Sequence, residues 1–378
     1  MKRTLPKILK RCLIPILLLT LACTGRMPQS DLTAAVETPF VTEAPTEEPE
    51  PVVITVPSEP PAATLPPAPT ERPTPTPAPT EVPPHEPDIA PVGGTEIEVD
   101  ASLAFSDPGV VATDYRGKDL TSRVKSTGEV VPYLVGDYTI TYTVSDDYGF
   151  TSTVVRTVHV KPVEMPEIVE PPEKTIYLTF DDGPCGNTNN LLDVLKKYDV
   201  KATFFVVGTM GRPEVIKRAY EEGHAIGIHC YEHEYKKIYK SEKAYFEDFM
   251  AMQEVVREAT GSYTRIFRFP GGSANTASRF NKGIMTRLTK IMKDMGYRYF
   301  DWNVSAGDTG EKQSPSVYES RIISGIRKKE PFAIVLQHDI KPNSVHAVEG
   351  VIKWGLKNGY TFLPLDITSP RVESDVNN

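Results

Sequence analysis

Short apolar runs alternate with amphipathic stretches over roughly the last 200 residues of the chain. The runs are KTIYLTF, ATFFVV, HAIGIH, RIFRF, YRYFDW, FAIVLQH and YTFLPL. Between them, RPEVIKRAYEEG places Pro213 at a helix start and Gly223 just past its end, and Ser241 offers an N-cap to the longer stretch that follows it. Strands that alternate with helices predict parallel βα units, and seven or eight such units predict an α/β barrel.

A different period governs the preceding segment, 89–162. GDYTITYTVSDDYGFTSTVVRTVHV puts Tyr138, Ile140, Tyr142 and Val144 on one face, followed by turn residues at 147–149 and a second alternating run. This pattern predicts a β-hairpin. The segment resembles a bacterial immunoglobulin-like module, a small all-β sandwich, and it contains no cluster of catalytic residue types. We interpret it as a spacer, with weak glycan contact as the alternative.

The first residues, MKRTLPKILKRCLIPILLLTLACTG, combine a basic start with an apolar run from Leu13 to Ala22. This run is short for a membrane span and has the order of an export signal. LTLAC resembles a bacterial lipobox, in which Cys23 becomes the lipidated first residue, although Thr20 stands where leucine is usual. We therefore expect residues 1–23 to be a lipoprotein-type signal and the protein to be anchored on the outer face of the cytoplasmic membrane. An ordinary cleaved signal and an uncleaved anchor are the alternatives.

Residues 24–88 have the composition of a disordered linker. Between positions 31 and 90 lie 17 of the 35 prolines, and 11 of the 50 acidic residues stand there against one basic residue, Arg72. Proline removes backbone hydrogen-bond donors and the acidic side chains repel one another, so the segment cannot build a core. We expect an extended tether that reaches into the cell wall. Because the acidity is concentrated here, the rest of the chain is close to neutral, and neither nucleic acid nor another strongly charged partner is indicated.

Polar residues stand where the predicted strands of the last part end. The first strand runs into Asp181 and Asp182, the third into His229, the fourth into Arg268 and the sixth into His338, and the fifth runs into Asp301 and Trp302. In α/β barrels the working residues lie at the carboxyl ends of the strands. The sequence therefore predicts a functional site on this rim.

The motifs that carry these residues resemble those of the polysaccharide deacetylases, the carbohydrate esterases with the NodB homology domain. TFDDGP (179–184), HCYEH (229–233), RFPGG (268–272), DW (301–302) and LQH (336–338) occur in that family's order. The resemblance covers roughly half the chain and implies a distorted (β/α) barrel of the NodB type, which we place at 171–368. It also implies hydrolysis of N-acetyl groups from a glycan.

A metal site follows from both the residue types and the resemblance. Asp182, His229 and His233 supply one oxygen and two nitrogens, the open three-ligand set of a catalytic zinc site. We expect Zn²⁺ or another divalent ion such as Co²⁺ to bind there. The metal would polarise the acetyl carbonyl and lower the pKa of a bound water.

The resemblance also implies the roles of the proton carriers. Asp181 would be the general base and His338 the general acid, with Arg268 orienting Asp181 and Asp301 orienting His338. The backbone N–H of Gly271 would be an oxyanion donor, and Trp302 and Leu336 would line the acetyl pocket. Phe269 and Gly271 depart from the usual motif, which has proline and tyrosine in these places.

A further departure is Cys230, where the family has serine or threonine. After export, Cys185 and Cys230 would be the only ordinary thiols, and both lie close in sequence to metal ligands. We favour a disulfide between them, which would tie the two ligand loops together. Two packed free thiols, or a thiolate that competes for the metal, are the alternatives.

Two other functions remain open at this point. HCYEH also fits H-x-x-E-H, the signature of inverted zinc proteases, in which Glu232 would be the base on a helix carrying both histidines. That hypothesis leaves TFDDGP unexplained. A non-catalytic glycan-binding relative would be expected to lack a ligand or the acid, and none is missing. Acetate release compared with peptide cleavage separates these possibilities.

The expected substrate is the cell wall that the tether reaches. We expect N-acetylglucosamine in peptidoglycan to be deacetylated, ahead of N-acetylmuramic acid and then of chitin oligomers or acetylated xylan. The expected state is a monomer.

Overall fold

The computed structural model describes residues 83–376 and residue 378. The predicted export signal, 1–23, and most of the predicted linker, 24–88, lie outside the described residues. Within the described residues, none of the helices combines the length and apolar character needed to cross a membrane.

A small all-β unit occupies the first described part. Strand β1 (Asp88–Pro91) pairs antiparallel with β3 (Val110–Thr113), and a second sheet has the strand order β2-β6-β5-β4. The remaining elements of this unit are β2 (Glu96–Asp100), the 3-10 turn η1 (Thr121–Arg123), β4 (Lys125–Thr127), β5 (Gly136–Ser145) and β6 (Thr151–Lys161).

The predicted hairpin is confirmed as β5 and β6. The two strands pair antiparallel from Gly136–Val160 to Ser145–Thr151. Ile140, Tyr142 and Val144 are buried, because alternate side chains of a strand point to the same face. In the turn, Asp146 Oδ1 accepts hydrogen bonds from the backbone N–H groups of Tyr148 and Phe150, both at 2.9 Å.

A single curled parallel sheet forms the centre of the second part. Its strand order is β11-β10-β9-β8-β7-β13-β12, and β14 pairs alongside β7. The strands are β7 (Thr175–Asp181), β8 (Thr203–Val207), β9 (Ala225–Cys230), β10 (Ile266–Phe267), β11 (Arg298–Tyr299), β12 (Val304–Ser305), β13 (Phe332–His338) and β14 (Thr361–Phe362). Among the described residues no pairing joins β11 to β12, so the sheet is an open, distorted barrel.

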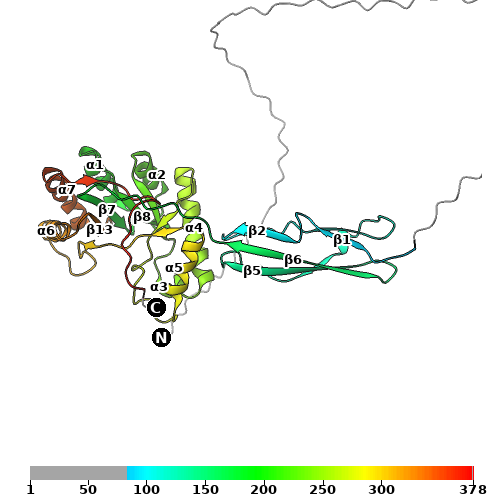
Figure 1. The fold of residues 1–378 in the computed structure, drawn as a ribbon. Coiled ribbons are helices and arrows are strands. Elements are labelled where there is room, and N and C mark those ends of the chain that lie inside the picture. The colour runs from blue at the N-terminus through cyan, green and yellow to red at the C-terminus, as the bar shows by residue number, and fades with distance from the viewer. Residues whose placement is uncertain (1–82, 377) are drawn as a thin grey trace, which may run out of the picture. The chain divides into compact units, whose positions relative to one another are not determined.

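Helices cover the outside of this sheet, and Figure 1 shows α1, α2, α6 and α7 around the strands β7, β8 and β13. The helical elements are α1 (Gly186–Lys197), η2 (Gly208–Met210), α2 (Pro213–Glu221), α3 (Tyr235–Ile238), α4 (Glu242–Thr260), α5 (Ile284–Asp294), α6 (Pro315–Ile326) and α7 (Pro342–Lys357). Two predicted helix ends are confirmed. Pro213 begins α2, and the Ser241 side chain accepts a hydrogen bond from Ala244 N–H at the start of α4.

Burial on both faces explains why the strands read as continuous apolar runs. All seven residues of β7 are buried, as expected for a parallel strand between a core and a helical layer. One cluster of buried side chains fills the inner face of the sheet, and its members are Tyr177, Phe205, Ile266, Phe300, Ile334 and Leu365. The α/β fold predicted for this part, preceded by a small all-β unit, is therefore confirmed.

Candidate metal centre and catalytic site

The parallel strands bring the predicted polar residues to one rim. Asp181 is the last residue of β7 and lies directly opposite His338, the last residue of β13. His229 lies at the end of β9, and Arg268 follows β10. Since carboxyl ends of parallel strands share an edge, residues from four distant segments meet there.

Asp182, His229 and His233 form a triad with the dimensions of a metal site. Asp182 Oδ1 lies 3.5 Å from His229 Nε2 and 3.4 Å from His233 Nε2, and one ligand atom from each residue lies within 4.8 Å of the others. These separations are long for hydrogen bonds. They match the edges of a tetrahedron around an ion whose bonds are about 2.0–2.2 Å, which places the ligands roughly 3.4 Å apart.

The surroundings of the triad favour the binding of a cation. Asp182 Oδ1 is buried without a hydrogen-bond partner among the described residues, a costly state for a carboxylate unless a cation binds it. His229 Nδ1 lies 2.8 Å from the Arg268 carbonyl oxygen. This bond requires the proton on Nδ1, so Nε2 faces Asp182 as a lone-pair donor. Burial lowers the pKa of His229, which favours the neutral, ligating form. The residues fit a divalent metal.

Asp181 is held beside the triad by a buried arginine. Arg268 Nη1 donates to Asp181 Oδ1 at 2.8 Å and to Thr179 Oγ1 at 2.7 Å, and Arg268 Nε donates to the Phe300 carbonyl at 2.7 Å. Asp181 is 3 % exposed and Arg268 is completely buried. This ion pair and the two further hydrogen bonds of the guanidinium hold the Asp181 carboxylate in one orientation, as the predicted role of Arg268 requires.

His338 is oriented by Asp308, and this corrects the predicted role of Asp301. His338 Nδ1 lies 2.8 Å from Asp308 Oδ1, and the His338 backbone N–H donates to Asp308 Oδ2 at 2.9 Å. His338 Nε2 points to the metal side, 3.9 Å from Asp182 Oδ2. Burial acts to lower the pKa of His338, but the Asp308 hydrogen bond and the charge of Asp181 outweigh it and raise the pKa above 6.5.

Asp301 has a different set of partners. Its carboxylate accepts from the backbone N–H and the hydroxyl of Ser273 and from the Ser374 N–H. Its own carbonyl accepts from Arg268 Nη2 at 3.3 Å. Asp301 is therefore bonded to the glycine loop after Arg268 and to a late segment of the chain, and the prediction that it orients His338 was wrong.

The sequence carried a weak signal for Asp308. This residue stands three positions after the two-residue strand β12, so it too lies at a strand's carboxyl end. The family resemblance instead pointed to Asp301, because the DW motif (301–302) stands in the family's order. Asp308 is 3 % exposed and bonds to His338, and only these features of the folded chain identify it as the partner of His338.

The three predicted substrate-binding positions lie on the same rim. Gly271 has a φ of 77°, and its N–H makes no hydrogen bond among the described residues, so it is free to act as a donor. The Trp302 ring lies 5.6 Å from the Arg268 guanidinium. Leu336 is buried one pleat below His338 on the inner face. Their contacts with an acetyl group stay predictions.

A second carboxyl group, missed by the sequence reading, supports the TFDDGP loop from beneath. Asp339 is fully buried and accepts from Thr188 Oγ1 at 2.6 Å, and a side chain at Gly183 would collide with it. Burial, followed by the charges of Asp182 and Asp181, raises the pKa of Asp339 to about 7 despite the Thr188 bond.

The predicted disulfide is absent, because both cysteines are free. Cys185 is the N-cap of α1, where its sulfur accepts from Asn187 N–H at 3.3 Å. Cys230 is buried in β9, and burial raises the pKa of its thiol well above 9. The alternative of two packed thiols is the one that the structure supports.

The protease reading is also contradicted. His229 belongs to strand β9 and His233 lies in the loop beyond it, so the two histidines do not share a helix. Glu232 pairs with Lys237 at 2.9 Å.

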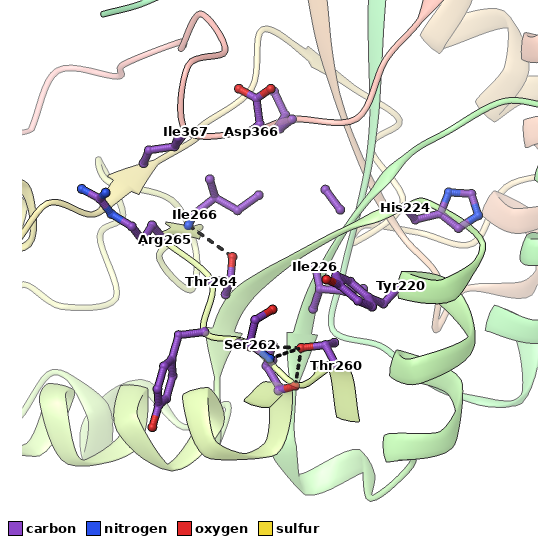
Figure 2. A pocket seen from close by; sticks show the side chains of 14 residues that line it. Tyr220, His224, Ile226, Thr260, Ser262, Thr264, Arg265, Ile266, Asp366 and Ile367 are labelled. Atoms are coloured by element: carbon purple, nitrogen blue, oxygen red, sulfur yellow. Dashed lines mark hydrogen bonds between the residues drawn. The ribbon is translucent and has the colours of Figure 1, made fainter. Parts of the chain in front are cut away.

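A separate cavity of about 320 Å³ lies at the opposite ends of the strands. Figure 2 shows Ile226, Thr264 and Ile266 around it, from the starts of β9 and β10. Arg265 and Asp366 in its wall are already hydrogen-bonded to Gly296 and to Ser369 and Thr368. This cavity lacks the arrangement of acid, base and ligands found at the rim.

Comparison with known proteins finds one family for the second part of the chain and another for the all-β unit. Residues 168–300 match the family model "Polysaccharide deacetylase", and residues 90–160 match "Bacterial surface protein, Ig-like domain". A peptidoglycan-N-acetylglucosamine deacetylase of Bacillus cereus is 32 % identical over 194 residues, which cover 50 % of this chain and 68 % of that protein. A peptidoglycan-N-acetylmuramic acid deacetylase of Bacillus subtilis is 32 % identical over 201 residues, 51 % of this chain and 71 % of that one.

One solved structure of a peptidoglycan deacetylase is more similar to this chain in sequence. The catalytic domain of a peptidoglycan N-acetylglucosamine deacetylase from Eubacterium rectale is 47 % identical, with a TM-score of 0.55, and the match covers 56 % of this chain and 98 % of that one. The chain thus belongs to the polysaccharide deacetylase family, and its N-terminal all-β unit is an Ig-like module.

Proposed function

We propose that this chain is a metal-dependent hydrolase that removes acetyl groups from N-acetylglucosamine in peptidoglycan. The observation that carries the proposal is the open triad of Asp182, His229 and His233, with a buried base and a buried acid beside it. The similarity to peptidoglycan deacetylases of Bacillus cereus and Eubacterium rectale supports the choice of substrate.

The triad would hold a divalent ion, with Zn²⁺ proposed and Co²⁺ as an alternative. When bound, the ion supplies a Lewis acid for the acetyl carbonyl and lowers the pKa of the attacking water. Asp182 provides the anionic ligand, and the two histidines provide neutral nitrogens. His229 is fixed by its bond to the Arg268 carbonyl, so at least one ligand is preorganised.

Asp181 and His338 would carry the protons. Asp181, fixed by Arg268, accepts a proton from the attacking water. His338 keeps Nδ1–H on Asp308 and presents Nε2 to the site, so its protonated form donates to the departing amine. The free N–H of Gly271 would stabilise negative charge on the former carbonyl oxygen. Trp302 and Leu336 are proposed to wall the acetyl group.

The substrate can be tested directly on cell walls. Purified walls are incubated with wild-type protein and with Asp181→Asn protein as a matched control, digested to disaccharide fragments and analysed by mass spectrometry. We expect loss of 42 mass units on the glucosamine residue with wild-type protein only. Loss on muramic acid, or activity confined to chitin oligomers or acetylated xylan, would contradict the choice of sugar, and peptide cleavage would contradict the reaction.

We also propose that the protein is exported and anchored to the outer face of the cytoplasmic membrane through a lipidated Cys23, and that it acts there as a monomer. The support for export and for the anchor is the lipobox-like LTLAC and the proline-rich tether after it. Metabolic labelling with a fatty acid, compared between wild type and Cys23→Ser, tests the anchor. Equal labelling of both would contradict it.

A further inference from the structure

Tyr235 lies next to the metal triad without belonging to it. It begins α3, two residues after His233, and its ring centroid lies 5.3 Å from that of His233 in an edge-on arrangement. On its other side it stacks on Tyr239 at 6.3 Å with an interplanar angle of 18°. The ring is half-buried and held between two aromatic neighbours.

The Tyr235 ring also fills the space beside Gly271. A Cβ placed on Gly271 would lie 3.3 Å from both Cε1 and the hydroxyl oxygen of Tyr235. The loop of Gly271 therefore approaches the phenol closely because it carries no side chain there. The hydroxyl thus lies close to the glycine whose free N–H faces the reacting carbonyl in the proposed reaction.

The Tyr235 hydroxyl has no hydrogen-bond partner among the described residues. It is also absent from the set of unpaired polar atoms that are closed off from solvent, so a ligand can reach it. Its neighbour Tyr239 differs, because that hydroxyl donates to the Pro270 carbonyl at 2.9 Å. Phenylalanine would make the same ring contacts as Tyr235. Packing therefore explains the ring of Tyr235 and leaves its hydroxyl, which can both donate and accept, available to a ligand.

We propose that Tyr235 is a substrate-contacting residue whose hydroxyl donates a hydrogen bond to an oxygen of the sugar that carries the acetyl group at the metal centre. The inference rests on the proposed function and adds to it a contact with the sugar. Because this bond lies outside the reacting acetyl group, it forms equally in the bound substrate and in the transition state. It therefore acts on KM more than on kcat.

Two substrates separate this role from a role in packing or metal binding. Wild type, Tyr235→Phe and the control Tyr263→Phe are compared on a soluble N-acetylglucosamine oligomer and on 4-nitrophenyl acetate, which has an acetyl group but no sugar. Tyr263 is a suitable control because it is exposed, lies by the cavity at the opposite strand ends and bonds to Glu254. Metal content is measured for each protein.

For Tyr235→Phe we expect kcat/KM on the oligomer to fall on the order of threefold to tenfold through KM, the range of one neutral hydrogen bond. Its rate on 4-nitrophenyl acetate and its metal content should equal those of wild type, as should all values for Tyr263→Phe. An equal loss on both substrates, or no loss on either, would overturn the inference. A wild-type protein that cleaves the aryl ester but releases no acetate from any glycan would instead overturn the proposed function, and the sugar contact with it.

Discussion

Replacement of Asp308 by asparagine tests the assignment of the residue that orients the general acid. Asp308 and His338 are 3 % and 8 % exposed and share a 2.8 Å bond. A hydrogen bond to a charged group is worth about 1.5–3 kcal/mol, more than a neutral one. Asparagine keeps the shape of the side chain and removes its charge. Its amide nitrogen would face the His338 backbone N–H, and the hydrogen bond that this N–H now donates to Asp308 Oδ2 would be lost.

The size of the effect follows from these numbers. If the imidazolium form of His338 loses about 1.5–3 kcal/mol, its pKa falls by about one to two units. His338 must be protonated to act as the acid, so the rate falls as pH rises through this pKa. In Asp308→Asn the descending limb of the pH–rate profile should therefore move to lower pH. At a pH above the shifted limb, kcat/KM should fall roughly 10- to 100-fold.

The assay is acetate release from a soluble N-acetylglucosamine oligomer between pH 5 and pH 9, with metal content and thermal unfolding measured in parallel. Asp301→Asn is the matched comparison, because Asp301 bonds to Ser273 and Ser374 and leaves His338 untouched. We expect Asp301→Asn to keep the position of the descending limb. A shifted limb in Asp301→Asn together with an unshifted limb in Asp308→Asn would refute the reasoning.

Three further predictions follow from the same rim. His229→Ala should lose both metal and acetate release while remaining folded, because it removes a ligand that is fixed by the Arg268 carbonyl; stoichiometric metal after gel filtration, measured by mass spectrometry, would contradict this. Asp181→Asn should keep the metal and lose roughly 10²–10⁴-fold in kcat, the usual effect of a positioned base, and wild-type turnover would assign the base to another residue. Asp339, whose pKa is raised from 3.8 to about 7, stabilises the fold in its protonated form, so its contribution is present below pH 4 and is lost as pH rises through 7. In urea titrations of the metal-free protein, this group should lower the free energy of unfolding by about 2–3 kcal/mol between pH 5 and pH 8. Asp339→Asn should lack this loss. An equal dependence of the unfolding free energy on pH in both proteins would contradict the assignment.

Much of the molecule was accessible from local sequence, for reasons that are themselves local. Helix ends at Pro213 and Ser241 depend on backbone groups within a few residues, and the β5–β6 hairpin depends on alternation and turn chemistry. The placement of His229 and His338 at strand ends needed only the rule that parallel strands finish at one edge. These predictions required no knowledge of which distant segments touch.

Pairings between distant side chains were decided by the tertiary structure. Asp301 and Asp308 are both acidic residues near a strand end, and nothing in their local sequence tells which carboxylate reaches His338, 30 or more positions away. The same limit applies to Cys185 and Cys230, which are close in sequence to ligands of one site and are nevertheless free. Sequence determined which residues reach the rim, because strand direction is a property of the repeated βα unit. The close fit of Tyr235 against Gly271, and the choice of acid partner, came from loop geometry over distances of a few ångströms, and only the folded chain sets those distances.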